Sequence, residues 1–211
     1  MKGKPAIVRG FIMMVLLGAL LSLVPWQAGA ADSKTLENLM AAYNGESNAH
    51  AKYLAFAEKA DKEGYGKVAS LFRAAASAEE IHLKSHAEVI KGMGGVPKAD
   101  IKVPEIKSTK ENIESGLQGE NYERITMYPD FIAQAQKENN KAAVRTFTYA
   151  KFAEIEHAKL YKEALDNLET WKGAKTDFFV CPVCGYTVKG KPPFEACPVC
   201  ATPTKDYKIV N

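Results

Sequence analysis

Two Glu-x-x-His pairs, each set in an apolar helical stripe, restrict the possible folds of this chain more than any other feature. A helix turns every ~3.6 residues, so Glu154 and His157 share one face with alanine, leucine and aromatic side chains. A helix predicted over residues 67–91 repeats the pattern with Glu79 and His82. An ionised carboxylate buried without a partner is strongly destabilising. The two pairs therefore predict a cation shared between two helices.

Two further segments predict helices that each bring a glutamate to the apolar face. Asp32 or Ser33 can cap a helix through residue 60, and the apolar stripe of that helix includes Glu46. Ser108, followed three residues later by a glutamate, has the spacing of a capping box and begins a third helix with Glu120 on its apolar face. Single glutamates on two helices and Glu-x-x-His pairs on two others are typical of di-iron carboxylate bundles.

The helical region also contains an internal repeat. Gly-Glu at 45–46 matches Gly-Glu at 119–120, and the Glu-x-x-His motif at 79–82 matches the motif at 154–157. Between the halves, residues 92–107 are rich in glycine and proline, and this length allows a crossover along the bundle. We therefore expect two copies of one helical hairpin, related by a pseudo-twofold axis that carries two metal ions.

A fifth glutamate breaks this symmetry. Glu123 lies on the apolar face of the third helix, whereas its equivalent in the first half is Ala49. The donors of the predicted site are oxygen and imidazole nitrogen, which favour iron or manganese over copper. Pro129 predicts a kink in the same helix.

A second, smaller domain follows the bundle. Residues 169–176 are expected to be a linker, and Phe178–Val180 to be a strand. Two Cys-x-x-Cys knuckles then follow, a spacing typical of a tetrahedral four-thiolate metal site; they contain Cys181, Cys184, Cys197 and Cys200. Two disulfides are the alternative in an exported protein, but adjacent cysteines in two knuckles suit a metal better. Iron and zinc both accept four thiolates, so both remain open.

The first thirty residues have the organisation of a secretory signal peptide. Lys2, Lys4 and Arg9 precede an uncharged apolar run over residues 11–24, and residues 28–30 have the small-x-small form of a cleavage site. An uncleaved membrane anchor is the alternative, although the run is short for a span. We therefore predict a protein that is periplasmic or otherwise exported. It should have a signal peptide at 1–30, a helical bundle at 31–170 and a four-cysteine domain at 171–211.

Charge gives no support for nucleic-acid binding. The whole chain has 28 basic and 25 acidic residues, a net charge of +3. The predicted signal peptide contains three basic residues and no acidic ones, so the mature chain has a net charge of zero. A nucleic-acid-binding domain usually has a basic patch, and none is expected here.

Taken together, these motifs resemble the rubrerythrin family over nearly the whole mature chain. The resemblance implies a mainly α protein with a ferritin-like four-helix bundle, a C-terminal rubredoxin-like domain, and reduction of hydrogen peroxide to water in oxidative-stress defence. It implies a di-iron site and a four-cysteine iron site with these ligands: Glu46, Glu79, His82, Glu120, Glu123, Glu154 and His157 for the first, and Cys181, Cys184, Cys197 and Cys200 for the second.

The resemblance also implies roles for other groups. Tyr53 and Tyr128 match the hydrogen-bonding tyrosines of the family, and Glu123 is expected to replace His82 on one iron during oxidation. The implied partners are hydrogen peroxide, an electron-donor protein that the sequence does not identify, and a second copy in a head-to-tail dimer whose four-cysteine iron supplies the electrons. Ala201 ends the second knuckle, where the resemblance leads us to expect glycine.

Two other functions fit the same residues. The bundle could act as a ferroxidase or oxidase that uses dioxygen instead of peroxide. Alternatively, the protein could bind metal or transfer electrons without catalysis, its small domain being a structural zinc ribbon. The two enzymatic readings differ in their oxidant, and the non-catalytic one differs in the metal at the cysteines.

Overall fold

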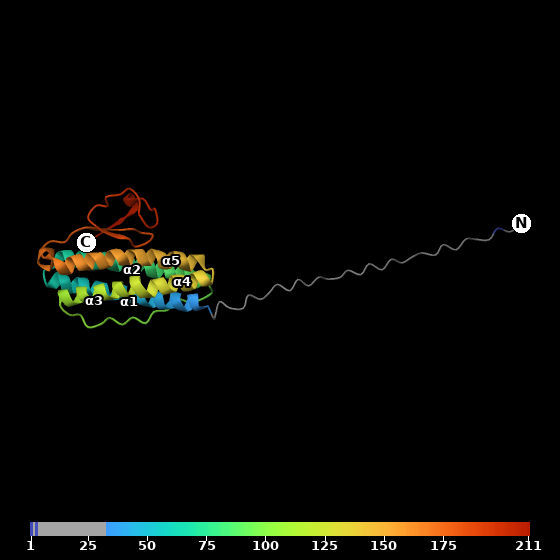
Figure 1. Ribbon diagram of the computed structural model, residues 1–211, viewed down its shortest axis with the longest axis horizontal. Helices are drawn as coiled ribbons and strands as arrows, with labels where there is room; N and C mark the ends of the chain where they lie inside the picture. The colour runs from blue at the N-terminus through green and yellow to red at the C-terminus, as the bar shows by residue number, and fades with distance from the viewer. Residues whose placement is uncertain (2, 4–32) are drawn as a thin grey trace.

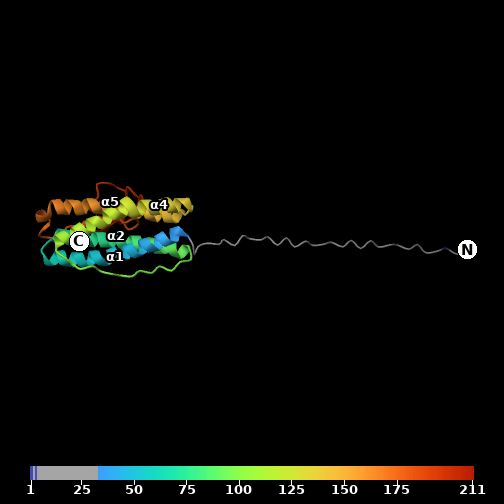
Figure 2. The same cartoon turned by 60° about the horizontal axis from the view of Figure 1, so that its bottom comes forward.

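The first helical hairpin follows its expected boundaries closely in the computed structural model, which describes residues 1, 3 and 33–211. Helix α1 (Lys34–Lys62) begins at Ser33, whose side chain accepts a hydrogen bond from the backbone amide of Leu36. A short turn leads into α2 (Gly66–Gly92). The two helices pack side by side along their length (Figures 1 and 2).

The second half of the bundle consists of a long interrupted helix and a continuous one. The predicted capping box is confirmed, because Ser108 and Glu111 exchange hydrogen bonds at the start of α3 (Thr109–Tyr122). The chain continues through the π-helix η1 (Glu123–Met127) into α4 (Tyr128–Lys137), and then turns into α5 (Lys141–Asp166). Figure 1 shows the segment between α2 and α3 running along the bundle, as expected for a crossover.

The interruption of the third helix begins earlier than the sequence predicted. Pro129 lacks the backbone N–H that an α-helix needs, and it occupies the first turn of α4, where that donor is not required. The irregular backbone is the π-helix that starts at Glu123. A π-helix accommodates an extra residue within a helix and often marks a functional site.

The small domain packs against the side of the bundle formed by α2 and α5 (Figure 1). After the short 3-10 helix η2 (Leu168–Trp171), an antiparallel three-stranded sheet has the order β2-β1-β3. Its strands are β1 (Phe178–Val180), β2 (Thr187–Lys189) and β3 (Lys208–Val210), and the 3-10 helix η3 (Thr204–Asp206) precedes β3. The predicted strand 178–180 is confirmed.

The bundle core is divided into two apolar clusters. One cluster contains Tyr53, Phe72 and Tyr161, and the other contains Leu39 and Phe147. On α1, α2 and α5, buried glutamate or histidine residues lie between the members of the two clusters. A polar layer therefore crosses the middle of the bundle and is sealed by apolar side chains on both sides.

The predicted signal peptide lies outside the described residues. Export to the periplasm and cleavage near residue 30 therefore stay predictions. Within residues 33–211, no helix is both long and apolar enough to cross a bilayer.

Candidate metal centres

Six buried side chains from α1, α2, α3 and α5 converge in the polar layer. They form two overlapping groups of four, and within each group the potential ligand atoms lie within 4.8 Å of one another. The first group is Glu46, Glu79, His82 and Glu154, and the second is Glu79, Glu120, Glu154 and His157. Each group contains one histidine and glutamates from both halves of the bundle, and Glu79 and Glu154 belong to both groups.

The hydrogen bonds of this cluster are incomplete in a way that a cation would correct. Glu46, Glu79 and Glu120 each have one buried oxygen without a hydrogen-bond partner among the described residues. A buried polar atom left unsatisfied costs about 1–3 kcal/mol. All three side chains are fully buried. The oxygen-rich donor set therefore fits two metal ions.

The pKa values of the glutamates also indicate that the cluster is suited to bind metal ions. Burial and the surrounding carboxylates raise the pKa of Glu46 and that of Glu120 well above the ordinary value. Burial alone would also raise the pKa of Glu154, but the imidazoles of His82 and His157 lower it to about 2. The glutamates cannot all be ionised at neutral pH without additional positive charge.

Both histidines contact the small domain through the ring nitrogen that faces away from the carboxylates. Nδ1 of His82 lies 2.9 Å from Oε2 of Glu79, while its Nε2 lies 3.1 Å from the backbone carbonyl oxygen of Cys184. Nε2 of His157 lies 3.1 Å from the hydroxyl of Thr187. Outer hydrogen bonds of this kind fix the orientation and tautomer of metal-binding histidines. The small domain therefore orients both imidazoles.

Each predicted tyrosine forms a hydrogen bond with one carboxylate of the cluster. The Tyr53 hydroxyl donates to Glu120 over 2.6 Å, and the Tyr128 hydroxyl donates to Glu46. Nε2 of His86 lies 3.2 Å from the Tyr128 hydroxyl. Burial lowers the pKa of His86 to about 3, so its imidazole is neutral and can donate that hydrogen bond from Nε2.

The Thr146 hydroxyl supports this assignment from the other side of the ring. It lies 3.0 Å from Nδ1 of His86. A hydroxyl can donate to Nδ1 only if that nitrogen carries no proton. The chain from Thr146 through His86 and Tyr128 to Glu46 is therefore consistent at every step.

Glu123 lies at the edge of the cluster and outside both groups of four. It is half-buried at the first residue of the π-helix. Burial, followed by the nearby carboxylates of Glu154 and Glu79, raises its pKa to about 8, while Lys52 acts in the opposite direction. Its predicted role as a ligand stays a prediction.

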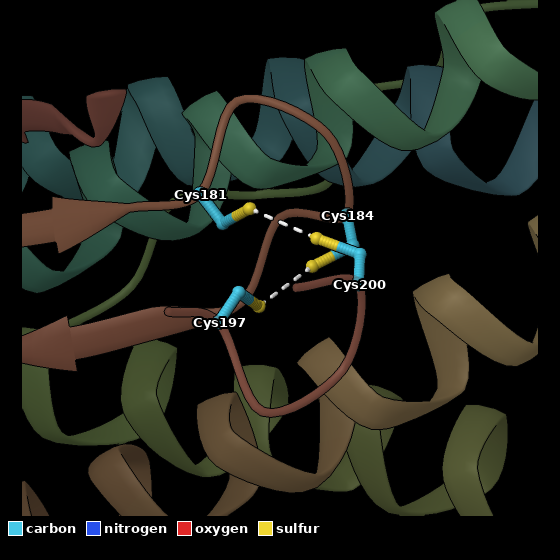
Figure 3. Close-up of side chains that lie close together, drawn as sticks. All are labelled: Cys181, Cys184, Cys197 and Cys200. Carbon is cyan, nitrogen blue, oxygen red and sulfur yellow. Dashed lines mark hydrogen bonds between the residues drawn. The ribbon is translucent and has the colours of Figure 1, made fainter. Parts of the chain in front are cut away.

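The four predicted cysteines come together in the small domain (Figure 3). All four thiols are free, and the Sγ atoms of Cys181 and Cys200 are 3.4 Å apart. The Sγ atoms of Cys184 and Cys197 are 3.5 Å apart. A disulfide bond is about 2.05 Å long. The geometry therefore supports the four-thiolate metal site and not the two disulfides.

Comparison with known proteins agrees with both centres. The family model described as Rubrerythrin matches residues 37–165, and the one described as Rubrerythrin, rubredoxin-like domain matches residues 179–208. The chain belongs to the rubrerythrin family. As its members do, this rubrerythrin carries a di-iron carboxylate site in a ferritin-like bundle and a rubredoxin-like four-cysteine iron site.

Individual relatives cover most of this rubrerythrin. Nigerythrin of Nitratidesulfovibrio vulgaris strain Hildenborough is 46% identical over 183 residues, which are 84% of this chain and 89% of that protein. A solved structure of nigerythrin in its fully reduced, all-ferrous state has a TM-score of 0.78 and 40% identity, and the match covers 97% of this chain and 100% of that one. A Desulfovibrio desulfuricans bacterioferritin has a TM-score of 0.61 and 24% identity, covers 65% of this chain and 81% of that one, and shows the fold alone.

One predicted partner of this rubrerythrin is a second copy of the chain. The resemblance implied that a neighbouring subunit supplies the electron-donating iron. In this structure the chain's own first cysteine knuckle already contacts His82 through Cys184. The head-to-tail dimer stays a prediction.

Proposed function

We propose that this rubrerythrin reduces hydrogen peroxide to water, and that its four-cysteine iron site returns the electrons to the di-iron site. One observation carries the proposal: the backbone carbonyl of Cys184, a thiolate residue of one centre, accepts a hydrogen bond from His82 of the other. A covalent path with a single hydrogen bond thus joins the two centres. The presence of both centres in this family supports the same function.

Protons are supplied by this chain's own side chains. Reduction of one peroxide molecule to two water molecules consumes two electrons and two protons, and the di-iron site supplies the electrons when it is loaded. Tyr53 and Tyr128 hold phenolic protons against Glu120 and Glu46, one on each side of the polar layer. Phenols in such positions can donate hydrogen bonds or protons to a bound oxygen substrate.

The two apolar clusters keep bulk water away from this chemistry. The carboxylates of Glu46 and Glu120 are completely buried, and the side chains of Tyr53 and Tyr128 are at most 1% exposed. In such surroundings the hydrogen bonds to the carboxylates are stronger than they would be in water. The chain therefore holds its proton donors in fixed positions before the substrate arrives.

A substitution at the first knuckle tests the proposal. Cys184→Ser removes one thiolate of the electron-returning site and leaves the bundle unchanged, so a single turnover of the reduced di-iron site with peroxide should persist. Sustained turnover with an added reductant should be lost. The control is Val183→Ala, which changes an exposed side chain of the same knuckle.

The outcomes separate the competing functions. Sustained turnover of Cys184→Ser at the wild-type rate would refute the electron route. If the reduced wild-type protein reacts faster with dioxygen than with peroxide, the oxidase reading replaces the peroxidase reading. If neither oxidant reoxidises the di-iron site, the protein is not an enzyme of this class.

A further inference from the structure

Tyr161 is a third buried tyrosine of the bundle core, in the same apolar cluster as Tyr53, and the chemistry described so far does not use it. It lies on α5, is completely buried, and its hydroxyl makes no hydrogen bond of regular geometry within residues 33–211. Its ring packs 5.7 Å from the ring of Tyr53 and 5.4 Å from that of Phe72, measured between centroids. A buried hydroxyl without a partner is unfavourable, so its retention requires a reason.

The internal repeat supplies the reason. The glutamates at positions 46 and 120 are 74 residues apart, whereas the tyrosines at positions 53 and 128 are 75 apart. The additional residue falls in the segment that contains the π-helix, where an α-helix can accommodate an insertion. The π-helix therefore brings Tyr128 into the position that corresponds to Tyr53.

In the second half of the internal repeat, Tyr161 occupies the position that His86 occupies in the first half. Positions 86 and 161 are 75 residues apart, as are the two Glu-x-x-His motifs, and each lies one helical turn after the motif's histidine. In one half of the site, His86 contacts the tyrosine that donates to Glu46. In the other half, Tyr161 packs against the tyrosine that donates to Glu120. The two arrangements correspond group by group.

We infer that Tyr161 is a positioning residue whose hydroxyl donates a hydrogen bond to the phenolic oxygen of Tyr53. The Tyr53 proton is directed at Glu120, so the lone pairs of the Tyr53 oxygen are free to accept. A second donor behind Tyr53 fixes the orientation of that proton and strengthens the bond to Glu120, because successive hydrogen bonds polarise one another. His86 has the same function behind Tyr128.

Two further observations agree with this assignment. Burial and the nearby carboxylates of Glu120 and Glu79 raise the pKa of Tyr161, so its hydroxyl keeps its proton and can donate a hydrogen bond. A Cβ on Gly116 of α3 would lie only 3.1 Å from the Tyr161 ring, so the absence of a side chain at Gly116 lets the ring lie against α3. Packing therefore holds the Tyr161 ring in place, and its hydroxyl is available to donate a hydrogen bond to Tyr53.

The first test needs no catalysis. The full-length chain is labelled with tyrosine carrying carbon-13 at Cζ and is loaded with zinc, which is diamagnetic. Tyr161→Phe keeps the ring and removes the hydroxyl, so the Cζ resonance of Tyr53 should shift while that of Tyr128 stays in place. His86→Phe should do the reverse. A Tyr53 resonance that does not move in Tyr161→Phe overturns the inference.

The second test uses the iron-loaded enzyme and depends on the proposed function. Loss of one hydrogen bond is worth about 1 kcal/mol, so Tyr161→Phe should lower kcat for peroxide about fivefold with little change in KM. Tyr161→His, which installs the donor found in the other half, should restore part of kcat, and Tyr43→Phe on α1 is the control. If wild-type protein does not reduce peroxide, the proposed function fails, while the resonance of Tyr53 still decides the role of Tyr161. A resonance shift with an unchanged kcat overturns the positioning role.

Discussion

At Gly185, the addition of one methyl group should push the small domain away from the helical bundle. It follows Cys184 in the first knuckle and has a φ angle of +75°. A Cβ at this residue would lie 2.4 Å from Nε2 of His82. Non-bonded carbon and nitrogen atoms approach to about 3.5 Å, so Gly185→Ala has to move the knuckle away from α2 by about 1 Å.

The energetic cost follows from two terms. The left-handed backbone conformation costs an alanine about 1 kcal/mol. A shift of about 1 Å also lengthens the 3.1 Å contact between His82 and Cys184 beyond hydrogen-bonding range, which removes about 1 kcal/mol more. We therefore expect Gly185→Ala to lower the free energy of unfolding by about 2 kcal/mol and to slow electron transfer from the four-cysteine iron to the di-iron site.

Gly190 offers a matched control in the same domain. Its φ angle is +71°, but a Cβ there would meet no atom within 4 Å. Gly190→Ala should therefore show the backbone cost alone, about 1 kcal/mol, with an unchanged rate of electron transfer. Urea unfolding and stopped-flow absorbance of the four-cysteine iron measure the two quantities. Equal behaviour of both variants would show that the contact with His82 does not couple the domains.

Two further predictions concern backbone strain and pH. Ala201 has a φ angle of +61° at the place equivalent to Gly185, so Ala201→Gly should raise the free energy of unfolding by about 1 kcal/mol in urea titrations; a loss of stability would contradict the strain argument. In the metal-free protein the pKa of Glu123, raised to about 8, lies above its unfolded value, so between pH 6.5 and pH 8 the folded state holds a proton that the unfolded state has released. Glu123 alone should therefore lower stability by at most about 2 kcal/mol as pH rises across this interval; the raised pKa values of Glu46 and Glu120 act in the same direction, and iron loading should abolish the trend. Equal unfolding midpoints of the metal-free protein at the two pH values would refute it.

The parts of the fold that depend on local chemistry could be predicted from the sequence. Ser33 and Ser108 cap helices because their hydroxyls reach backbone amides within the same turn. The glutamates and histidines of the site were recognisable because charged residues interrupt apolar stripes. The two Cys-x-x-Cys knuckles were recognisable because their spacing is typical of a four-thiolate metal site.

Other features depend on contacts that the spacing of residues does not specify. The hydrogen bond between His82 and Cys184 arises from the docking of one domain on another, which periodicity does not describe. The π-helix was anticipated only as a kink at Pro129, although the change of offset between the repeats from 74 to 75 residues contains its signal. Tyr161 lies on the same apolar helix face as Glu154 and His157, and only the structure shows that its hydroxyl is buried without a hydrogen-bond partner among residues 33–211.

The division of the core by a charged layer has a consequence for cooperativity. Each apolar cluster packs mainly with itself, and the carboxylates between them repel one another when they are ionised. Metal ions convert that repulsion into attraction among all four helical segments. We therefore expect iron to tie the two hydrophobic halves together, so that the metal-free bundle unfolds less cooperatively than the iron-loaded one.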